Sequence, residues 1–174
     1  MKKCGFIFLL ALVAAASAKA QRDNKPWSIG FGLEAGTPLG TTGNGYTVTG
    51  GATLRFSYKL GPGFATISSG ARLYYPKKVT GEQTKAALQI PVMAGYKYIF
   101  MKHLFVMGEL GYSSFRYYYG DGNGGLAHSS TSGFTYAPSA GVQFGAFEAG
   151  VKYEGIALSG GTLSDLSLRL GFNF

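Results

Sequence analysis

The chain has 174 residues, of which 14% are charged and 15% aromatic, with 28 glycines, one cysteine and a formal net charge of +8. An ordinary soluble domain contains about 25% charged residues, so this chain lacks the charge that a fully water-exposed surface needs. The single cysteine excludes a disulfide framework, and the modest, scattered basic excess does not indicate a nucleic-acid partner.

The first twenty residues have the layout of a secretory signal. Two lysines precede an apolar run at 6–16, and small residues follow at 18–20. The run is shorter than the ~20 residues of a spanning helix, which favours a signal over the alternative, an N-terminal membrane anchor. We predict that 1–20 is a cleaved signal peptide, that Cys4 leaves with it, and that 21–174 forms one outer-membrane β-barrel domain.

From Trp27 onward, apolar and polar residues alternate with a period of two, which is typical of strands with two different faces. The predicted strands are 27–36, 46–60, 64–75, 87–100, 104–116, 133–144, 147–156 and 166–174. The connections after the first, third, fifth and seventh strands are long and polar, with the longest at 119–132 and the last at 157–163. The other three are tight turns. Pro91 and Pro138 fall inside predicted strands, where we expect bulges or ladder ends.

Strands of about ten residues are long enough to cross a bilayer when tilted, and no stretch after the signal offers the ~18 consecutive apolar residues of a spanning helix. Alternating long and short connections are typical of membrane barrels. The sequence therefore predicts an all-β fold, an eight-stranded antiparallel up-and-down transmembrane β-barrel with both termini on the periplasmic side.

The position of the charges decides which face lies inside. A soluble ligand-binding barrel with its apolar face inward is the alternative. The charged face is rich in glycine, which suits an interior where small residues leave room for long side chains and opposite charges can pair. Aromatic residues gather near the strand ends, as two interfacial belts would require. The predicted luminal charge network comprises Glu34, Arg55, Lys59, Arg72, Lys97, Glu109, Glu148, Lys152, Glu154 and Arg169.

Five segments carry a resemblance to a known family. They are IGFGLEAGTP at 29–38, LRFSYKLGPG at 54–63, PVMAGYKYIF at 91–100, GFTYAPSAGVQF at 133–144 and the closing LSLRLGFNF. Together they resemble the small outer-membrane β-barrels related to OmpX and OmpA, some of which carry the porin-family name. The resemblance covers essentially all of 21–174, but it implies architecture rather than one function, because such barrels serve as anchors, adhesins or stress-linked proteins.

The resemblance also implies a location and partners. It implies the outer membrane of a Gram-negative cell, contact with outer-membrane lipid and lipopolysaccharide, and insertion by the barrel assembly machinery. In that family a terminal aromatic residue helps the machinery to recognise the last strand, which implies an assembly signal at Phe172 and Phe174. The alternative is that Phe174 is lipid-facing packing alone.

Residues with catalytic or metal-binding spacing are scarce. The sequence has no phosphate loop, zinc pattern or usably spaced carboxylate pair, so we predict no cofactor, no metal and no enzymatic activity. His128 and Ser130 suggest the alternative of a lipid A deacylase-like enzyme, but they fall in a predicted flexible loop. His103 falls in a predicted turn, where we expect contact with water or headgroups. Arg116 with Tyr117–Tyr119 is either a binding patch or part of an aromatic belt.

The leading hypothesis for function is a non-catalytic barrel that serves envelope integrity or binds surface ligands through its outer loops. A narrow pore is the third possibility, although eight strands leave little water-filled space.

Overall fold

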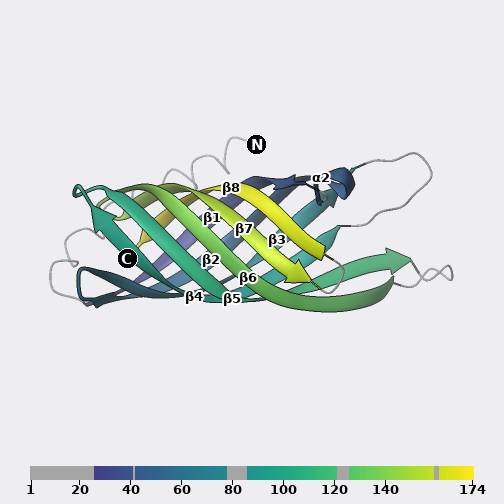
Figure 1. Ribbon diagram of the computed structural model, residues 1–174, viewed down its shortest axis with the longest axis horizontal. Coiled ribbons are helices and arrows are strands. Elements are labelled where there is room, and N and C mark those ends of the chain that lie inside the picture. Colours follow the sequence, from purple (N-terminus) through teal and green to yellow (C-terminus); the bar gives the residue numbers. More distant parts are fainter. Residues whose placement is uncertain (1–25, 41, 78–85, 121–125, 159–160) are drawn as a thin grey trace, which may run out of the picture.

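The computed structural model describes residues 26–40, 42–77, 86–120, 126–158 and 161–174. They form a closed barrel in which every strand pairs with its neighbours in chain order and the last strand closes on the first (Figure 1). This confirms the predicted eight-stranded antiparallel up-and-down barrel. The predicted signal at 1–20 lies outside the described residues. No helix among the described residues is long and apolar enough to cross a membrane.

The strands are separated by connections at two ends of the barrel. Their bounds are β1 Trp27–Leu39, β2 Tyr46–Leu60, β3 Gly63–Pro76, β4 Ala87–Phe100, β5 Leu104–Gly120, β6 Leu126–Phe144, β7 Phe147–Leu158 and β8 Gly161–Asn173. The short helix α2, Thr42–Gly45, lies between β1 and β2. We call the end with α2 the loop end. The end with the three tight turns and the C-terminus is the turn end.

Two predicted loops turn out to be mostly strand. Pairing of β5 with β6 continues to Gly120 and Leu126, so only 121–125 of the predicted loop 119–132 lies outside these strands. Likewise, β7 and β8 pair as far as Leu158 and Gly161. At the β5–β6 hairpin the sequence prediction failed because strands that extend beyond the barrel wall need no apolar face toward lipid, and the period-two signal disappears while the backbone ladder continues.

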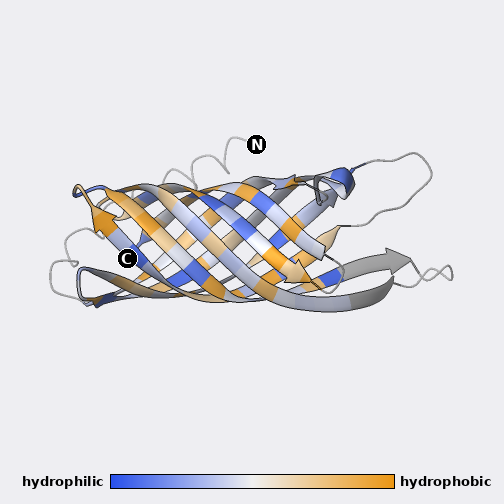
Figure 2. Cartoon of the chain, in the orientation of Figure 1, coloured by the Kyte–Doolittle hydropathy of each residue, from blue (hydrophilic) through white to orange (hydrophobic). Residues whose placement is uncertain are grey.

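The alternation of burial follows the alternation of the sequence. Along β1, Trp27, Ile29 and Phe31 are exposed on the outer wall, while Gly32 and Glu34 are buried inside. Hydropathy changes from residue to residue along the strands, so that orange and blue cross the barrel in bands (Figure 2). The apolar face is therefore the outer face, which is the arrangement of a membrane barrel and not of the soluble alternative.

The two prolines interrupt the ladder without changing the register. Pairing of β3 with β4 stops at Ser69–Val92 and resumes at Arg72–Gln89, on either side of Pro91. Pairing of β6 with β7 skips Pro138 in the same way, between Tyr136–Gly155 and Ser139–Lys152. These are the expected ladder ends, and no bulge forms because the pairs on both sides keep one register.

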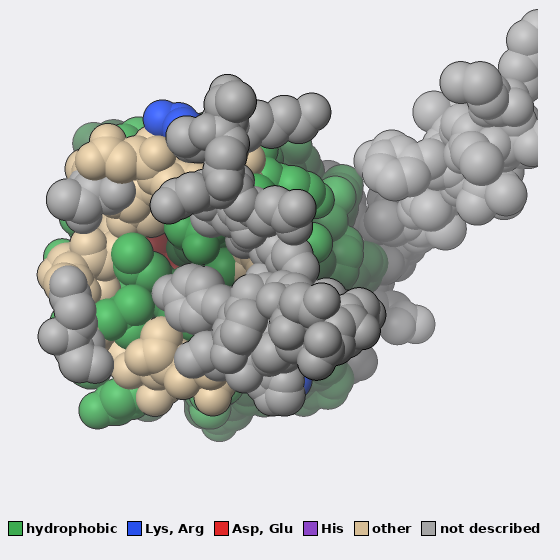
Figure 3. Space-filling model, turned by 90° about the vertical axis from the view of Figure 1, so that its right-hand side faces the viewer, with side chains coloured by type: hydrophobic (Ala, Val, Ile, Leu, Met, Phe, Trp, Pro, Cys, Tyr) green, Lys and Arg blue, Asp and Glu red, His purple; other side chains and the backbone are tan. Residues whose placement is uncertain are grey.

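An apolar cluster fills the lumen at the loop end. Tyr74, Ala87, Phe115 and Ile156 are each at most 1% exposed and pack together, with Tyr46, Leu158 and Leu163 against them. Seen from this end, hydrophobic side chains gather within the mouth of the barrel wherever described residues form it (Figure 3). The cluster lies in the lumen between the polar side chains and the loop end.

Candidate functional site in the barrel lumen

Ten charged side chains of the described residues are buried inside the barrel. Five are acids and five are bases, and each is at most 5% exposed. They are Glu34, Glu109, Glu148, Glu154, Asp165, Arg55, Arg72, Lys97, Lys152 and Arg169. The formal charges of this luminal charge network therefore cancel, as burial requires, because an unpaired charge in a low-dielectric interior is very costly.

Glycines make the room for these long side chains. Charged residues stand opposite glycines on neighbouring strands in the pairs Gly30–Arg55, Gly51–Glu34, Gly51–Arg72, Gly95–Glu109, Gly150–Arg169 and Gly171–Glu148. A Cβ on Gly51 would lie 2.9 Å from the Arg72 Cα, a backbone atom that cannot turn aside, so this position needs a residue without a side chain. The glycine-rich charged face is thus a steric requirement of a narrow, filled barrel.

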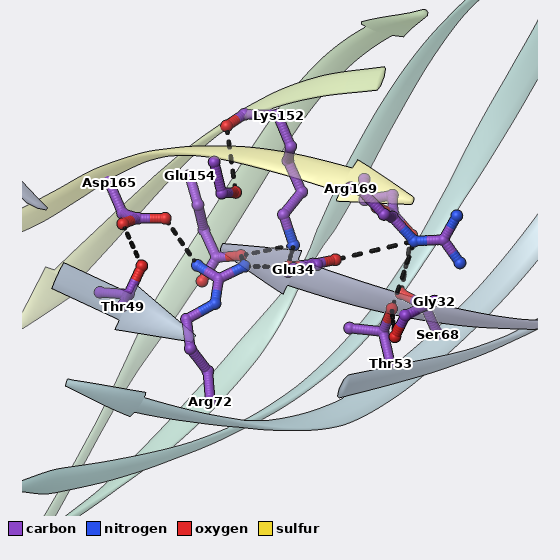
Figure 4. Close-up of polar contacts among 12 residues, drawn as sticks. Gly32, Glu34, Thr49, Thr53, Ser68, Arg72, Lys152, Glu154, Asp165 and Arg169 are labelled. Carbon is purple, nitrogen blue, oxygen red and sulfur yellow. Dashed lines mark hydrogen bonds and ion pairs between the residues drawn. The ribbon is translucent and has the colours of Figure 1, made fainter. Parts of the chain in front are cut away.

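Arg72 organises the loop-side cluster, which comprises Glu34, Arg72, Lys152, Glu154 and Asp165. Its guanidinium binds Glu34, lies 2.9 Å from the Asp165 carboxylate and 3.5 Å from that of Glu154 (Figure 4). Lys152 Nζ lies 2.6 Å from Glu34 and 3.2 Å from Glu154. Glu154 and Asp165 are cross-strand neighbours of like charge, and the two cations offset their repulsion.

Neutral polar groups extend the loop-side cluster toward the apolar cluster. Thr49 donates to Asp165 at 2.7 Å, and Gln89 donates to Glu154. Gln89 also donates to Ser113 at 3.0 Å and accepts from Tyr74 at 3.0 Å. The hydroxyl of Tyr74 thus joins the polar network while its ring packs with Phe115, which ties the charged lumen to the apolar cluster.

Glu148 organises the turn-side cluster, which comprises Arg55, Lys97, Glu109, Glu148 and Arg169. It accepts from Arg55 Nη1 at 2.8 Å, from Arg169 Nη1 at 2.5 Å and also from Lys97. Glu109 lies 3.7 Å from Arg55 Nη2. Arg169 connects the two clusters, because its Nε lies 3.7 Å from Glu34 (Figure 4).

The network leaves little free space in the lumen. Two cavities lined by its members each have a volume of about 10 Å³, one beside Arg55 and Arg169 and one beside Lys97 and Asn173. That volume is close to the space of one water molecule. The lumen between the described residues is therefore a packed polar core rather than an open channel.

The structure brings nine of the ten predicted network residues together and differs at two positions. Lys59 is exposed at the end of β2, so its prediction as a luminal residue was wrong. Lys59 lies on the same face of β2 as Arg55, because the two residues are four positions apart. However, the lumen ends before β2 reaches Lys59. Asp165 was missed because it fell between the predicted loop and the predicted last strand. Its spacing of four from Arg169 places it on the same face and could have revealed it.

The candidate catalytic pair does not lie in a loop. His128 and Ser130 belong to β6, where their backbones pair with Tyr118 and Arg116 of β5. His103 lies in the β4–β5 turn, where its ring Nδ1 is 3.2 Å from the Gln143 carbonyl oxygen and its ring packs 4.7 Å from Phe144. Within the described ranges, no group of three or more His, Cys, Asp or Glu side chains could hold a metal ion.

The closing strand carries the two predicted assembly residues. Phe174 exchanges backbone hydrogen bonds with Ile29 at 2.8 and 3.0 Å, and its ring is exposed. Phe172 packs edge-on against Phe147 with ring centroids 5.5 Å apart. Their role as an assembly signal stays a prediction.

No protein-family model and no curated protein matches the chain. Among solved structures it is similar to the N-terminal β-barrel domain of Pseudomonas aeruginosa OprF, with a TM-score of 0.64 and 12% identity over 86% of this chain and 98% of that one. It is also similar to Ail, the attachment invasion locus protein of Yersinia pestis, with a TM-score of 0.62 and 16% identity over 87% and 100%. Neisserial surface protein A has a TM-score of 0.54 and 12% identity over 86% and 98%. The chain therefore has the fold of the small outer-membrane β-barrels, as the sequence resemblance predicted.

Proposed function

We propose that this chain is an integral outer-membrane barrel without catalysis, which serves envelope integrity or binds surface ligands at its loop end. The observation that carries the proposal is the combination of an apolar outer wall with a charge-balanced, filled lumen. Leu54, Ile67 and Leu168 are 58%, 61% and 63% exposed on that wall. Such exposure suits acyl chains as neighbours and leaves the loop end for contacts outside the membrane. Removal of 1–20 during export is part of this proposal.

The β5–β6 hairpin supports a binding role. It is the longest pair of strands, and it extends beyond the barrel wall at the loop end (Figure 1). β4 pairs with β5 only as far as Tyr117, and the described part of β7 pairs with β6 only from Phe134 onward. The backbone of 126–133 thus presents an edge to which an extended polypeptide could add a strand.

Surface charge supports lipopolysaccharide as a partner. The five acids of the described ranges all lie in the lumen, whereas Lys77 and Arg116 are exposed near the loop end. Basic side chains at that level suit the phosphate groups of lipopolysaccharide, since guanidinium and ammonium groups are the usual phosphate partners.

The two alternatives have less support. A pore requires an open path, but the described lumen contains the charge network and, above it, the apolar cluster. A lipid deacylase requires a base held by a carboxylate, but the described carboxylates are buried in the lumen and paired with its cations. Barrel assembly machinery as a partner remains part of the proposal, through Phe172 and Phe174.

A shortened hairpin tests the binding role. Replacing 116–130 by Asn-Gly joins Phe115 to Thr131, which are paired, removes most of the edge at 126–133 and preserves the register with a two-residue turn. We expect the variant to reach the outer membrane and to keep heat-modifiable migration on detergent gels, but to lose cell-surface binding. A control with the sequence of 121–125 scrambled keeps the strand edge and should keep binding. Equal binding by the wild type and the shortened variant would refute the role of the hairpin.

Two further measurements test the alternatives. Lipid A from cells with and without the protein is compared by mass spectrometry, and a loss of acyl chains that Ser130→Ala abolishes would establish the enzyme instead. Steady single-channel conductance of the purified, folded protein in planar bilayers would establish the pore instead. A protein recovered in the soluble periplasmic fraction would refute the membrane location.

A further inference from the structure

Among the described residues, five buried polar atoms form no hydrogen bond, and three of them belong to residues that line one cavity beside the turn-side cluster. These three are Arg55 Nε, Arg169 Nη2 and Ser139 Oγ. Both arginines are only 3% exposed, so bulk water does not reach them. A buried donor that forms no hydrogen bond loses its hydration without compensation, and the loss is larger when the group is charged. Three such donors in one region call for a bound acceptor.

The residues that carry these atoms line the same cavity. It has a volume of about 10 Å³ and is lined by Arg55, Phe105, Ser139, Glu148, Gly150, Val151, Lys152 and Arg169. We call it the Ser139 cavity. The volume is close to that of one water molecule. In Figure 4 the two terminal nitrogens of Arg169 point away from Glu34, which its Nε contacts.

Glu148 cannot serve as the missing acceptor. Its Oε1 accepts from Arg55 Nη1 and Arg169 Nη1, and its Oε2 accepts from Lys97 and, at 3.4 Å, from Asn173 Nδ2. A carboxylate offers about four lone-pair sites, so those of Glu148 are all used. Lys152, another residue of the cavity wall, is a donor and is already paired with Glu34 and Glu154.

The local charge favours an acceptor with negative character. The turn-side cluster holds three bases, Arg55, Lys97 and Arg169, against two acids, Glu109 and Glu148. The loop-side cluster has the opposite imbalance. A water molecule or a halide ion can accept from a guanidinium N–H group, and a water molecule can in addition donate to the Ser139 Oγ.

We propose that the Ser139 cavity is a binding site for one small hydrogen-bond acceptor, either water or a halide ion, which completes the turn-side cluster. The site fixes the free N–H groups of Arg55 and Arg169 in place. By filling the cavity, the bound acceptor helps to make the lumen a single packed polar core.

Crystal structures of the full-length mature protein in detergent test the proposal directly. Crystals are grown in sodium chloride and in sodium bromide, and we expect density in the cavity at hydrogen-bonding distance from the three donors. An anomalous peak with bromide identifies the halide as the source, and density without that peak identifies water. An empty cavity, or arginines that turn to other acceptors, would overturn the proposal.

The sign of a stability change provides a second test. If Ser139 Oγ binds the acceptor, Ser139→Ala lowers the urea midpoint of unfolding, because a hydrogen bond is lost. If the hydroxyl has no partner, the substitution leaves the midpoint unchanged or raises it, because a desolvated polar group is removed. The matched control is Ser167→Ala, a luminal serine that donates to the Lys152 carbonyl at 3.4 Å and lies outside the cavity lining. A Ser139→Ala midpoint at or above that of the wild type contradicts the proposal.

A salt series separates the two sources in solution. At constant ionic strength, replacing sulfate by chloride lowers the midpoint of every variant, because sulfate strengthens burial. A halide in the site offsets part of that fall in the wild type and in Ser167→Ala but not in Ser139→Ala, since a ligand stabilises the state that binds it. With water as the occupant, all three proteins fall equally, and the loss of midpoint in Ser139→Ala remains.

Discussion

Glu148→Ala is the perturbation that tests the luminal charge network most directly. The carboxylate is 1% exposed and accepts from Arg55, Lys97 and Arg169. After its removal, the acidic partner left to Arg55 is Glu109 at 3.7 Å, and Arg169 keeps Glu34 at 3.7 Å and the Thr53 hydroxyl at 3.2 Å. Lys97 keeps the Gln143 side chain at 2.6 Å but loses its carboxylate partner. The turn-side cluster then holds three cations against one acid.

The expected cost follows from breaking a buried ion pair. Removal of one partner of such a pair destabilises a protein by about 3–5 kcal/mol, mostly because the remaining charge stays buried and uncompensated. The matched control is Lys59→Ala, since Lys59 was predicted as a network member but is exposed. A surface substitution of this kind changes stability by about 0.5 kcal/mol or less.

The assay is equilibrium urea unfolding of the protein in lipid vesicles, followed by the fluorescence of the single tryptophan, Trp27, on the outer wall. The double variant Glu148→Ala with Lys97→Met should recover part of the loss, because neighbours in one network couple by about 0.5–3 kcal/mol. A loss for Glu148→Ala no larger than that for Lys59→Ala would refute the network as a structural element.

Four further predictions concern the wall, the lumen and the closing strand. Leu168→Arg, on the outer wall, should cost about 2–4 kcal/mol in the same vesicle assay if this face meets lipid, and a neutral result would contradict the membrane location. Gly51→Ala should cost about 1–3 kcal/mol, because its Cβ would lie 2.9 Å from the Arg72 Cα of the neighbouring strand, which cannot turn aside. Phe115→Ala should cost about 3–5 kcal/mol through loss of apolar packing at a side chain that is 1% exposed. That variant should still give no steady conductance in planar bilayers, because the charge network remains beneath it. Phe174→Ala should slow outer-membrane assembly in cells while leaving unfolding in vesicles within about 0.5 kcal/mol, and normal assembly would remove its role as a signal.

Local pattern was enough to predict the barrel wall. Along 27–36 and 87–100, apolar residues recur at every second position. This alternation extends over the whole strand because one face contacts lipid and the other faces a narrow lumen. Strand segments beyond the barrel wall lack these two environments, and there the sequence did not predict the strands. Most of the β5–β6 hairpin beyond the wall was predicted as a loop, since strands outside the wall carry no two-faced pattern.

The membership of the luminal network was also predictable in large part, because parity alone assigns a charged residue to a face. Parity does not tell how far the lumen extends, which is why Lys59 was assigned wrongly. It also depends on strand bounds, which is why Asp165 was missed.

By itself, the sequence determined the strand number, the strand order and the face that each residue presents, because a period of two is a local property of the backbone. Only the tertiary structure decided which charges meet. Arg72 contacts Glu34, Glu154 and Asp165 from three other strands, and the register and closure of β8 on β1 bring these strands around one lumen. Pairing across a lumen depends on side chains far apart in the chain, so no local pattern encodes it.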